Sequence, residues 1–351
     1  MKLEEAVRER LPAPRAALSP LLGLALAAVI VLVVVLYPVV NQNAYQLRVA
    51  ANLFLNVSLV VGLWVVYATG LLNMGQIAFM GIGGYTAAAL ALHQGWSFWA
   101  LLPAGMMTAT IVGLVIGHIT LRLRGAYFFL VSFAFLEITR LFFTSFLKDV
   151  FGGTDGLVAI PVPPNLGIVN LATPTGHYYM TMGLMFLSVG VVWRVIASRN
   201  GLILRALGQS ESLAESVGIN AFWYRLVTFL MSCALAGLAG VVYAHLNLVV
   251  FPSDISLSRA VLVVVHMVVG GVGHILGPVL GAAVLTALGE WLRRFGTAEQ
   301  LAYGAMLILV MLAIPGGFIS LPGRLGQLLA ATWQAVSGLR VKGRKGVVAD
   351  S

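Results

Sequence analysis

Long apolar runs, separated by short polar segments, dominate the chain between residues 18 and 319. A helix needs about 20 apolar residues to cross the roughly 30 Å hydrocarbon core of a bilayer. Several runs reach this length and carry no charged residue over long stretches. The pattern predicts an all-α, polytopic bundle of about ten membrane-spanning helices, with eight as the lower bound. The predicted spans are 18–38, 49–69, 71–92, 98–119, 126–146, 177–197, 222–245, 258–270, 274–291 and 299–319.

Glycine interrupts two of the predicted spans. The third span is rich in glycine between residues 74 and 85, which predicts a broken helix there. The eighth span is short, and a glycine-rich turn separates it from the ninth. The glycines at these two places are Gly75, Gly81, Gly83, Gly84, Gly270, Gly271 and Gly273. Small residues four apart, such as Gly113 and Gly117, also let membrane helices approach closely.

The composition agrees with a membrane protein. The chain has 351 residues, of which 60% are hydrophobic and 9% are charged. Soluble domains usually carry about 25% charged residues, so these charges are too few to cover a soluble surface. We expect one membrane domain over 18–320, between tails at 1–17 and 321–351. The first apolar run is longer than most signal-peptide cores, which favours an uncleaved first span.

Basic residues are distributed unevenly among the predicted loops. The net charge is +9, and because Lys and Arg collect in cytoplasmic loops, the excess indicates topology rather than a nucleic-acid site. Ten spans place the larger group on one side: Lys2, Arg8, Arg10, Arg15, Arg122, Arg124, Arg194, Arg199, Arg205, Arg225, Arg324, Arg340, Lys342, Arg344 and Lys345. The smaller group on the other side is Arg48, Lys148, Arg259, Arg293 and Arg294. This bias predicts that both termini lie in the cytoplasm.

Sequence motifs for several chemistries are absent. No lysine follows glycine and precedes Ser or Thr, as a phosphate-binding P-loop requires, so ATP binding by that route is excluded. The chain has no His-Glu-x-x-His motif, its six histidines are scattered, and its single cysteine cannot form an intrachain disulfide. We therefore expect no catalytic site, no metal site and no cofactor.

One charged pair lies inside a predicted span. Glu137 and Arg140 are three residues apart in the fifth span and therefore share a helix face. Charge inside a membrane is costly and is usually paired or functional. A structural ion pair and a gating or coupling contact both remain open here. One pair without further carboxylates disfavours a proton-driven pump.

The predicted cytoplasmic loop 198–223 has the periodicity of a short amphipathic helix. Ser210 or Gln209 can cap this helix, Glu211 suits the positive end of its dipole, and Gly218 occupies a C-cap position. Such a helix either lies on lipid or docks into a groove of a soluble partner. Because Glu211 and Glu215 disfavour an anionic lipid surface, we expect docking.

Five segments share a pattern with known membrane proteins. They are GLLNMGQIAFMGIGGYTA (70–87), LRLRGAYFF (121–129), RALGQSESLAESVGIN (205–220), VVGGVGHILGPVLGA (268–282) and YGAMLILVML (303–312). In this order they resemble ABC importer permeases, in particular the LivM-type permeases for branched-chain amino acids. The resemblance runs from about residue 45 to 320. The chain departs from the family at 314–318, where IPGGF stands in place of a basic residue beside proline.

The resemblance implies one half of a translocation pore in a bacterial inner membrane. A second, LivH-like permease would supply the other half, two ABC ATPase subunits would bind underneath, and an extracytoplasmic binding protein would deliver the amino acid. The chain itself is then no enzyme, since ATP hydrolysis belongs to the ATPase subunits. The residues expected at the ATPase-coupling contact are Arg205, Glu211, Ala214, Glu215 and Gly218.

Polar residues of the second and third spans are candidates for the translocation path. They are Asn52, Asn56, Asn73, Gln76 and Tyr85. A zwitterionic amino acid needs amide or backbone partners, which broken helices expose; alternatively, these amides pack helix against helix. Two other functions remain open: an ABC permease of the same superfamily for urea, short amides or sugars, and an ion-coupled secondary transporter. The second needs intramembrane acids beyond Glu137.

Overall fold

The computed structural model describes residues 20–123, 125–146, 148–163, 170–313 and 317–318. The predicted tails and the segment 314–316 lie outside this part. Its long helices are α2 (Pro20–Val40), α3 (Ala44–Tyr67), α4 (Gln76–Gln94), α5 (Phe98–Thr120), α6 (Ala126–Ser145), α8 (Pro174–Ile196), α11 (Ala221–Asn247), α12 (Leu257–Gly270), α13 (Leu276–Leu292) and α14 (Glu299–Ala313). The short elements are α7 (Lys148–Phe151), η1 (Gly153–Asp155), β1 (Leu157–Val158), α9 (Arg199–Gln209), α10 (Glu211–Ser216), β2 (Val249–Val250), η2 (Pro252–Asp254) and η3 (Arg293–Ala298).

Each of the ten predicted spans contains a helix, and local capping sets several helix ends. The Asn43 side chain accepts a hydrogen bond from the Tyr45 amide at the start of α3. The Asn220 side chain accepts one from the Trp223 amide, which starts α11. Gly95 adopts a left-handed conformation and ends α4. Amide side chains at N-caps and glycine at C-caps satisfy backbone groups that have no partner within the helix.

The described helices differ in whether they are long and apolar enough to cross a membrane. Six segments are long and apolar enough to cross a membrane: α3, α5, α6, α8, α11 and Pro252–Gly270, which joins η2 to α12. Three shorter apolar helices are Val31–Val40 within α2, α13, and Leu301–Val310 within α14. The described residues thus form a multi-pass helical membrane protein.

The break predicted among the glycines of the third span lies elsewhere. The chain is non-helical from residue 71 to 75, and α4 then continues without interruption through Gly81, Gly83 and Gly84. These glycines serve close packing instead. A Cβ atom on Gly83 would lie 2.3 Å from the Gly237 carbonyl oxygen of α11, well inside van der Waals contact. The expectation of a broken helix is therefore corrected to a non-helical lead-in before a continuous helix.

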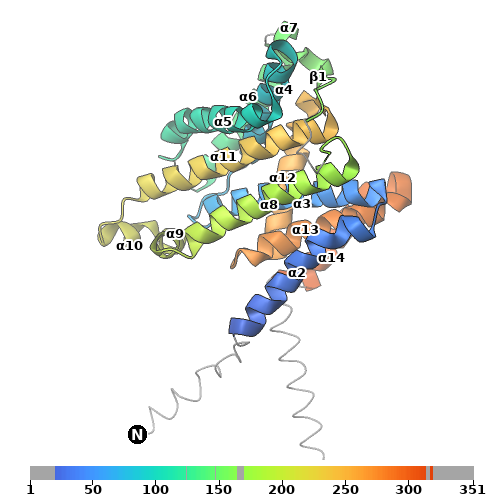
Figure 1. Ribbon diagram of the computed structural model, residues 1–351. Coiled ribbons are helices and arrows are strands. Elements are labelled where there is room, and N and C mark those ends of the chain that lie inside the picture. Colours follow the sequence, from blue (N-terminus) through green and yellow to red (C-terminus); the bar gives the residue numbers. More distant parts are fainter. Residues whose placement is uncertain (1–19, 124, 147, 164–169, 314–316, 319–351) are drawn as a thin grey trace, which may run out of the picture.

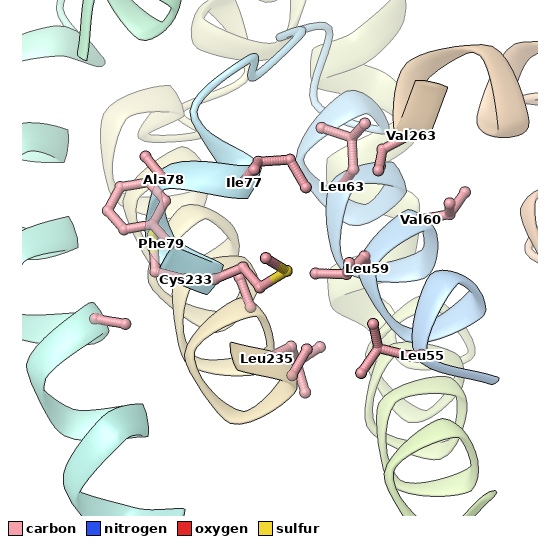
Figure 2. Packing of buried hydrophobic residues seen from close by; sticks show 14 of the residues in the cluster. Leu55, Leu59, Val60, Leu63, Ile77, Ala78, Phe79, Cys233, Leu235 and Val263 are labelled. Carbon is pink, nitrogen blue, oxygen red and sulfur yellow. The ribbon is translucent and has the colours of Figure 1, made fainter. Parts of the chain in front are cut away.

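The core forms where α4, α5 and α11 meet, because glycines let their backbones touch. Gly105 of α5 faces Gly83 of α4, and Gly237 of α11 faces Gly105 in turn. Cys233 is fully buried in α11 beside Gly113, as expected for a small hydrophobic residue. Figure 2 shows further apolar side chains of α3 and α4 in the same core, including Leu59 and Ile77.

The two ends of the bundle differ (Figure 1). Helices α9 and α10 lie together at one end, which we call the α10 end. At the opposite end, the sheet end, β1 pairs antiparallel with β2, with Leu157 opposite Val250. Helix α3 starts at the sheet end and ends beside α9, where Gly208 contacts the Ala68 carbonyl region. The segment 198–223, which is expected to contact an ATPase, therefore lies at the α10 end, away from the sheet end.

Candidate functional site

The five residues expected on a translocation path fall into two separate places. Asn52 and Asn56 line a cavity of about 920 Å³ at the sheet end. Asn73, Gln76 and Tyr85 lie in the buried interior and are at most 1% exposed. Residues of α3, α11, α12, α13 and α14 line the cavity, which is open on one side, and its volume is at the upper end of the range for small-molecule sites.

The cavity is mixed in character. Its polar and charged lining residues are Asn52, Asn56, Tyr243, Asn247, Ser258, Arg259, His266, Thr286, Glu290, Arg293 and Tyr303. Its aliphatic lining residues include Val261, Leu262, Val265, Leu285 and Leu307. Apolar walls with a few polar groups at fixed positions are typical of sites that bind small amphipathic solutes.

Most polar groups on the α3 and α13 side of the cavity are already paired. The Asn56 amide nitrogen donates to the Thr286 hydroxyl at 3.1 Å. The Glu290 carboxylate forms an ion pair with Arg293 at 3.2 Å and accepts a hydrogen bond from the Tyr45 hydroxyl. This wall is therefore held in place by side-chain contacts between helices.

On the α12 side of the cavity, Arg259 stands in an unusual environment. Its guanidinium lies 4.3 Å from the centre of the Tyr243 ring, a cation–π distance. Its nearest carboxylate oxygen, on Asp254, is 3.9 Å away. The Asp254 carboxylate instead accepts hydrogen bonds from the Tyr243 hydroxyl at 2.8 Å and the Phe251 amide at 2.9 Å. Arg259 is thus fixed in position while most of its N–H donors stay available.

The buried amides of α4 join helices to one another. The Ser232 hydroxyl of α11 lies 2.7 Å from the Gln76 amide oxygen and 2.6 Å from the Gly62 carbonyl oxygen of α3. The Asn73 side chain accepts from the Gly75 amide and shapes the non-helical lead-in to α4. Tyr85 stacks on Phe143 with ring centres 4.0 Å apart. These contacts favour the packing interpretation for Gln76, whereas the Asn73 amide nitrogen and the Tyr85 hydroxyl are buried without a hydrogen-bond partner among the described residues.

Helix α10 lies at the other end of the bundle and is largely exposed. Ser210 caps it by accepting from the Leu213 amide, and Gly218 ends it with a φ of +86°. Ala214 is buried, whereas Leu213 and Val217 are 70% and 76% exposed. An exposed apolar pair four residues apart, one on a short helix and the other at its C-cap, is typical of a segment that docks into a groove.

The five residues expected at the coupling contact have different environments. Arg205, on α9, is exposed, and so are Glu215 and Gly218. The Glu211 carboxylate forms an ion pair at 2.8 Å with Arg225 of α11, whose side chain is only 7% exposed. A cavity of about 320 Å³ lies beside this pair, lined by Arg122, Glu215 and Phe222 among others. Glu211 therefore attaches α10 to the membrane helices.

Arg225 and Arg259 were not among the residues singled out from the sequence. In the sequence each appears only as a basic residue that contributes to topology. Arg225 lies one turn inside α11, and a buried position in an apolar helix could have signalled a charged partner. No comparable signal marks Arg259, because its neighbours come from α11 and η2.

The Glu137–Arg140 pair forms as the spacing predicted. The Arg140 Nε atom donates to both carboxylate oxygens, at 3.0 and 3.1 Å. The Arg140 and Glu137 side chains are 34% and 40% exposed on α6, respectively. This local pairing agrees with the structural interpretation, and a gating role stays a hypothesis. Among the described residues, no group of three His, Cys, Asp or Glu side chains is placed to hold a metal ion.

Comparisons with known proteins give one family. The family described as branched-chain amino acid transport system / permease component matches residues 45–315. The high-affinity branched-chain amino acid transport system permease protein LivM of Salmonella typhimurium is 29% identical over 287 residues, covering 76% of this chain and 66% of that protein. The chain thus spans slightly less than two thirds of this relative.

Two more distant relatives carry different names. The probable branched-chain amino acid transport permease protein LivH of Methanocaldococcus jannaschii is 26% identical, covering 73% of this chain and 84% of that protein. The nucleoside ABC transporter permease protein NupC of Lactococcus lactis is 25% identical, covering 50% of this chain and 59% of that protein. No solved structure gives a significant match.

Proposed function

The chain belongs to the branched-chain amino acid transport system permease family, and from this premise we propose that it is the permease subunit of an ATP-driven importer for branched-chain or other small amino acids. The observation that carries the proposal is the family match, which extends over the bundle from α3 to α14. In this proposal ATP hydrolysis belongs to separate subunits, which is consistent with a sequence that contains no P-loop.

The proposed topology has ten spans and both termini in the cytoplasm, with the permease domain at 18–320 and cytoplasmic tails at 1–17 and 321–351. The α10 end then faces the cytoplasm of the bacterial inner membrane, and the sheet end faces outward. Basic residues support this orientation, since Arg122, Arg194, Arg199 and Arg205 gather near the α10 end.

The proposed complex contains a LivH-like second permease, two ABC ATPase subunits and an extracytoplasmic amino-acid-binding protein, all around a pore in the lipid bilayer. Likeness to both LivM and LivH proteins supports a paired permease. Co-purification of the full-length chain with its ATPases and second permease, followed by amino-acid-stimulated ATP hydrolysis in vesicles, tests this proposal. ATP-independent uptake by the chain alone would contradict it in favour of an ion-coupled transporter.

Helix α10 is the proposed contact with an ATPase groove. Its exposed Leu213 and Val217 provide the apolar contact, and Glu215 provides an exposed charge beside them. Arg205 and Gly218 border the same segment. Glu211 and the buried Ala214 hold the helix against the membrane domain, so movement of the ATPase groove would reach α11 directly.

Changing the exposed face or the end of α10 is expected to uncouple transport. Glu215→Arg reverses an exposed charge, and Gly218→Pro forbids the φ of +86° that ends the helix. We expect both variants to reach the membrane normally but to lose most binding-protein-stimulated ATP hydrolysis. Ser212→Ala, also exposed on α10, is the control. If both variants keep wild-type levels of binding-protein-stimulated ATP hydrolysis, α10 does not form the coupling contact.

Uptake assays separate the cavity residues from the buried amides. We expect Asn52→Leu to lower amino acid uptake while leaving the amount of assembled complex unchanged, because Asn52 lines the cavity. Gln76→Leu should instead destabilise the chain by about 1–3 kcal/mol, since two buried hydrogen bonds of the Gln76 amide, with the Ser232 hydroxyl and the Leu59 carbonyl, are lost. Uptake normalised to assembled complex is the measurement. A Gln76→Leu complex that assembles fully but does not transport would instead indicate that Gln76 lies on the translocation path.

A second cargo class has one observation in its favour. The relative NupC is named as a nucleoside permease, so this superfamily accommodates solutes other than amino acids. Urea, short amides and sugars belong to the same alternative. Stimulation of ATP hydrolysis by a loaded binding protein, tested across these solutes, decides between the two cargo classes.

A further inference from the structure

The cavity at the sheet end contains two polar side chains of α12 whose hydrogen-bonding capacity is not filled. Arg259 is three quarters buried, with its side chain 23% exposed, and its contacts leave N–H donors available. His266 is 6% exposed, and its Nδ1 atom has no hydrogen-bond partner among the described residues. Both residues line the same cavity. Buried polar groups without partners are rare and call for a ligand or a functional reason.

We infer that Arg259 binds the carboxylate of the transported solute, so that the cavity accepts carboxylate-bearing solutes and rejects uncharged ones. A guanidinium presents a planar fork of N–H donors that matches the two oxygens of a carboxylate. Its orientation is fixed in advance by the Tyr243 ring and by Asp254, which keeps its own hydrogen bonds to Tyr243 and Phe251. The inference rests on the proposed importer function and specifies the cargo within it.

The rest of the cavity suits an aliphatic amino acid. Val261, Leu262 and Val265 of α12 surround the side of the cavity that carries Arg259. Asn52 and Asn56 line the same cavity and offer amide oxygens to an ammonium group. His266 follows Arg259 by seven residues, or about 10 Å along the helix axis, and so marks a deeper position in the same cavity.

An anionic lipid headgroup is another possible source of the bound charge. The position of Arg259 disfavours it, because a lipid-binding arginine extends along the surface, whereas this side chain lies over the Tyr243 ring inside the cavity. A sugar or urea carries no carboxylate to complete the pairing of the guanidinium, whose contact with Asp254 is long at 3.9 Å. The structure therefore favours the amino acid over the uncharged cargo class.

The first test uses the complete importer in nanodiscs with saturating, leucine-loaded binding protein. We expect Arg259→Gln to lower the leucine uptake rate by about tenfold to a hundredfold, as loss of a charge-assisted hydrogen-bonded pair predicts. Arg259→Lys, which keeps the charge but not the fork, should recover part of the rate. The control is Arg294→Gln, an exposed arginine outside the cavity, with wild-type uptake expected. Unchanged uptake in Arg259→Gln would overturn the inference and leave the proposed importer function standing.

The second test needs no variant and so does not depend on folding of Arg259→Gln. The wild-type complex without binding protein is melted with leucine or with leucinol, which lacks the carboxylate. Stabilisation by leucine alone supports carboxylate binding, and equal effects of both overturn it. If the melting temperature rises with the anionic lipid content of the nanodisc rather than with leucine, Arg259 binds a lipid headgroup, and the inference is overturned. Wild-type complex that imports only an uncharged solute would overturn the importer proposal together with the inference.

Discussion

Valine in place of Gly240 is expected to prevent stable assembly of the membrane domain. A Cβ atom at Gly240 would lie 1.9 Å from the Met80 carbonyl oxygen and 2.7 Å from the Gly84 amide nitrogen. Both contacts are with the backbone of α4, which cannot move aside without separating α4 from α11. Overpacking in a tight core costs about 3 kcal/mol or more, a large share of the stability of most domains.

The matched control is Gly190→Val in the membrane helix α8. Gly190 is exposed and nothing lies within 4 Å of a Cβ atom built there. Both variants change helix propensity equally, so only the packing differs. The measurements are the yield of membrane-inserted protein and its melting temperature in detergent. Equal yields and melting temperatures for the two variants would show that the α4–α11 contact is looser than the backbone distances indicate.

Breaking the Glu211–Arg225 pair is expected to disconnect α10 from the membrane helices. The Arg225 side chain is only 7% exposed, and removing one partner of a buried ion pair costs about 3–5 kcal/mol because the other charge is left unpaired. We expect Glu211→Arg and Arg225→Glu each to lose most transport. The double variant, which reverses the pair, should restore a substantial part of it.

Transport per ATP hydrolysed distinguishes this positioning effect from simple loss of protein. Arg199→Met, an exposed arginine on α9, provides the control for removing positive charge from the same segment. Each variant is compared at equal amounts of assembled complex. Wild-type coupling in both single variants, or a double variant no better than either single one, would contradict a role for the pair.

Local patterns predicted most of the helices and little of their assembly. The span 126–146 matches α6 (Ala126–Ser145) because a long apolar run has one stable backbone conformation in a membrane. The Ser210 cap and the Gly218 terminus were also confirmed, since both depend on neighbouring residues alone.

Contacts between distant segments could not be predicted in the same way. Gln76 resembled a path residue in the sequence, but its environment is set by Ser232 and by the Leu59 and Gly62 carbonyl groups. Arg259 depends equally on Tyr243, in the preceding helix, and on the turn at Asp254. A single sequence does not specify which polar groups of different helices come together.

The backbone contact between α4 and α11 also constrains how the protein is made. At about 5–20 residues per second, a ribosome needs on the order of ten seconds to proceed from one helix to the other. During that interval α4 can pack against α5, with Gly83 facing Gly105, but α11 has not yet been made and the groove that it fills is empty. A nascent α4–α5 hairpin must therefore persist in the bilayer or at the insertion machinery until the second half of the chain arrives to complete it.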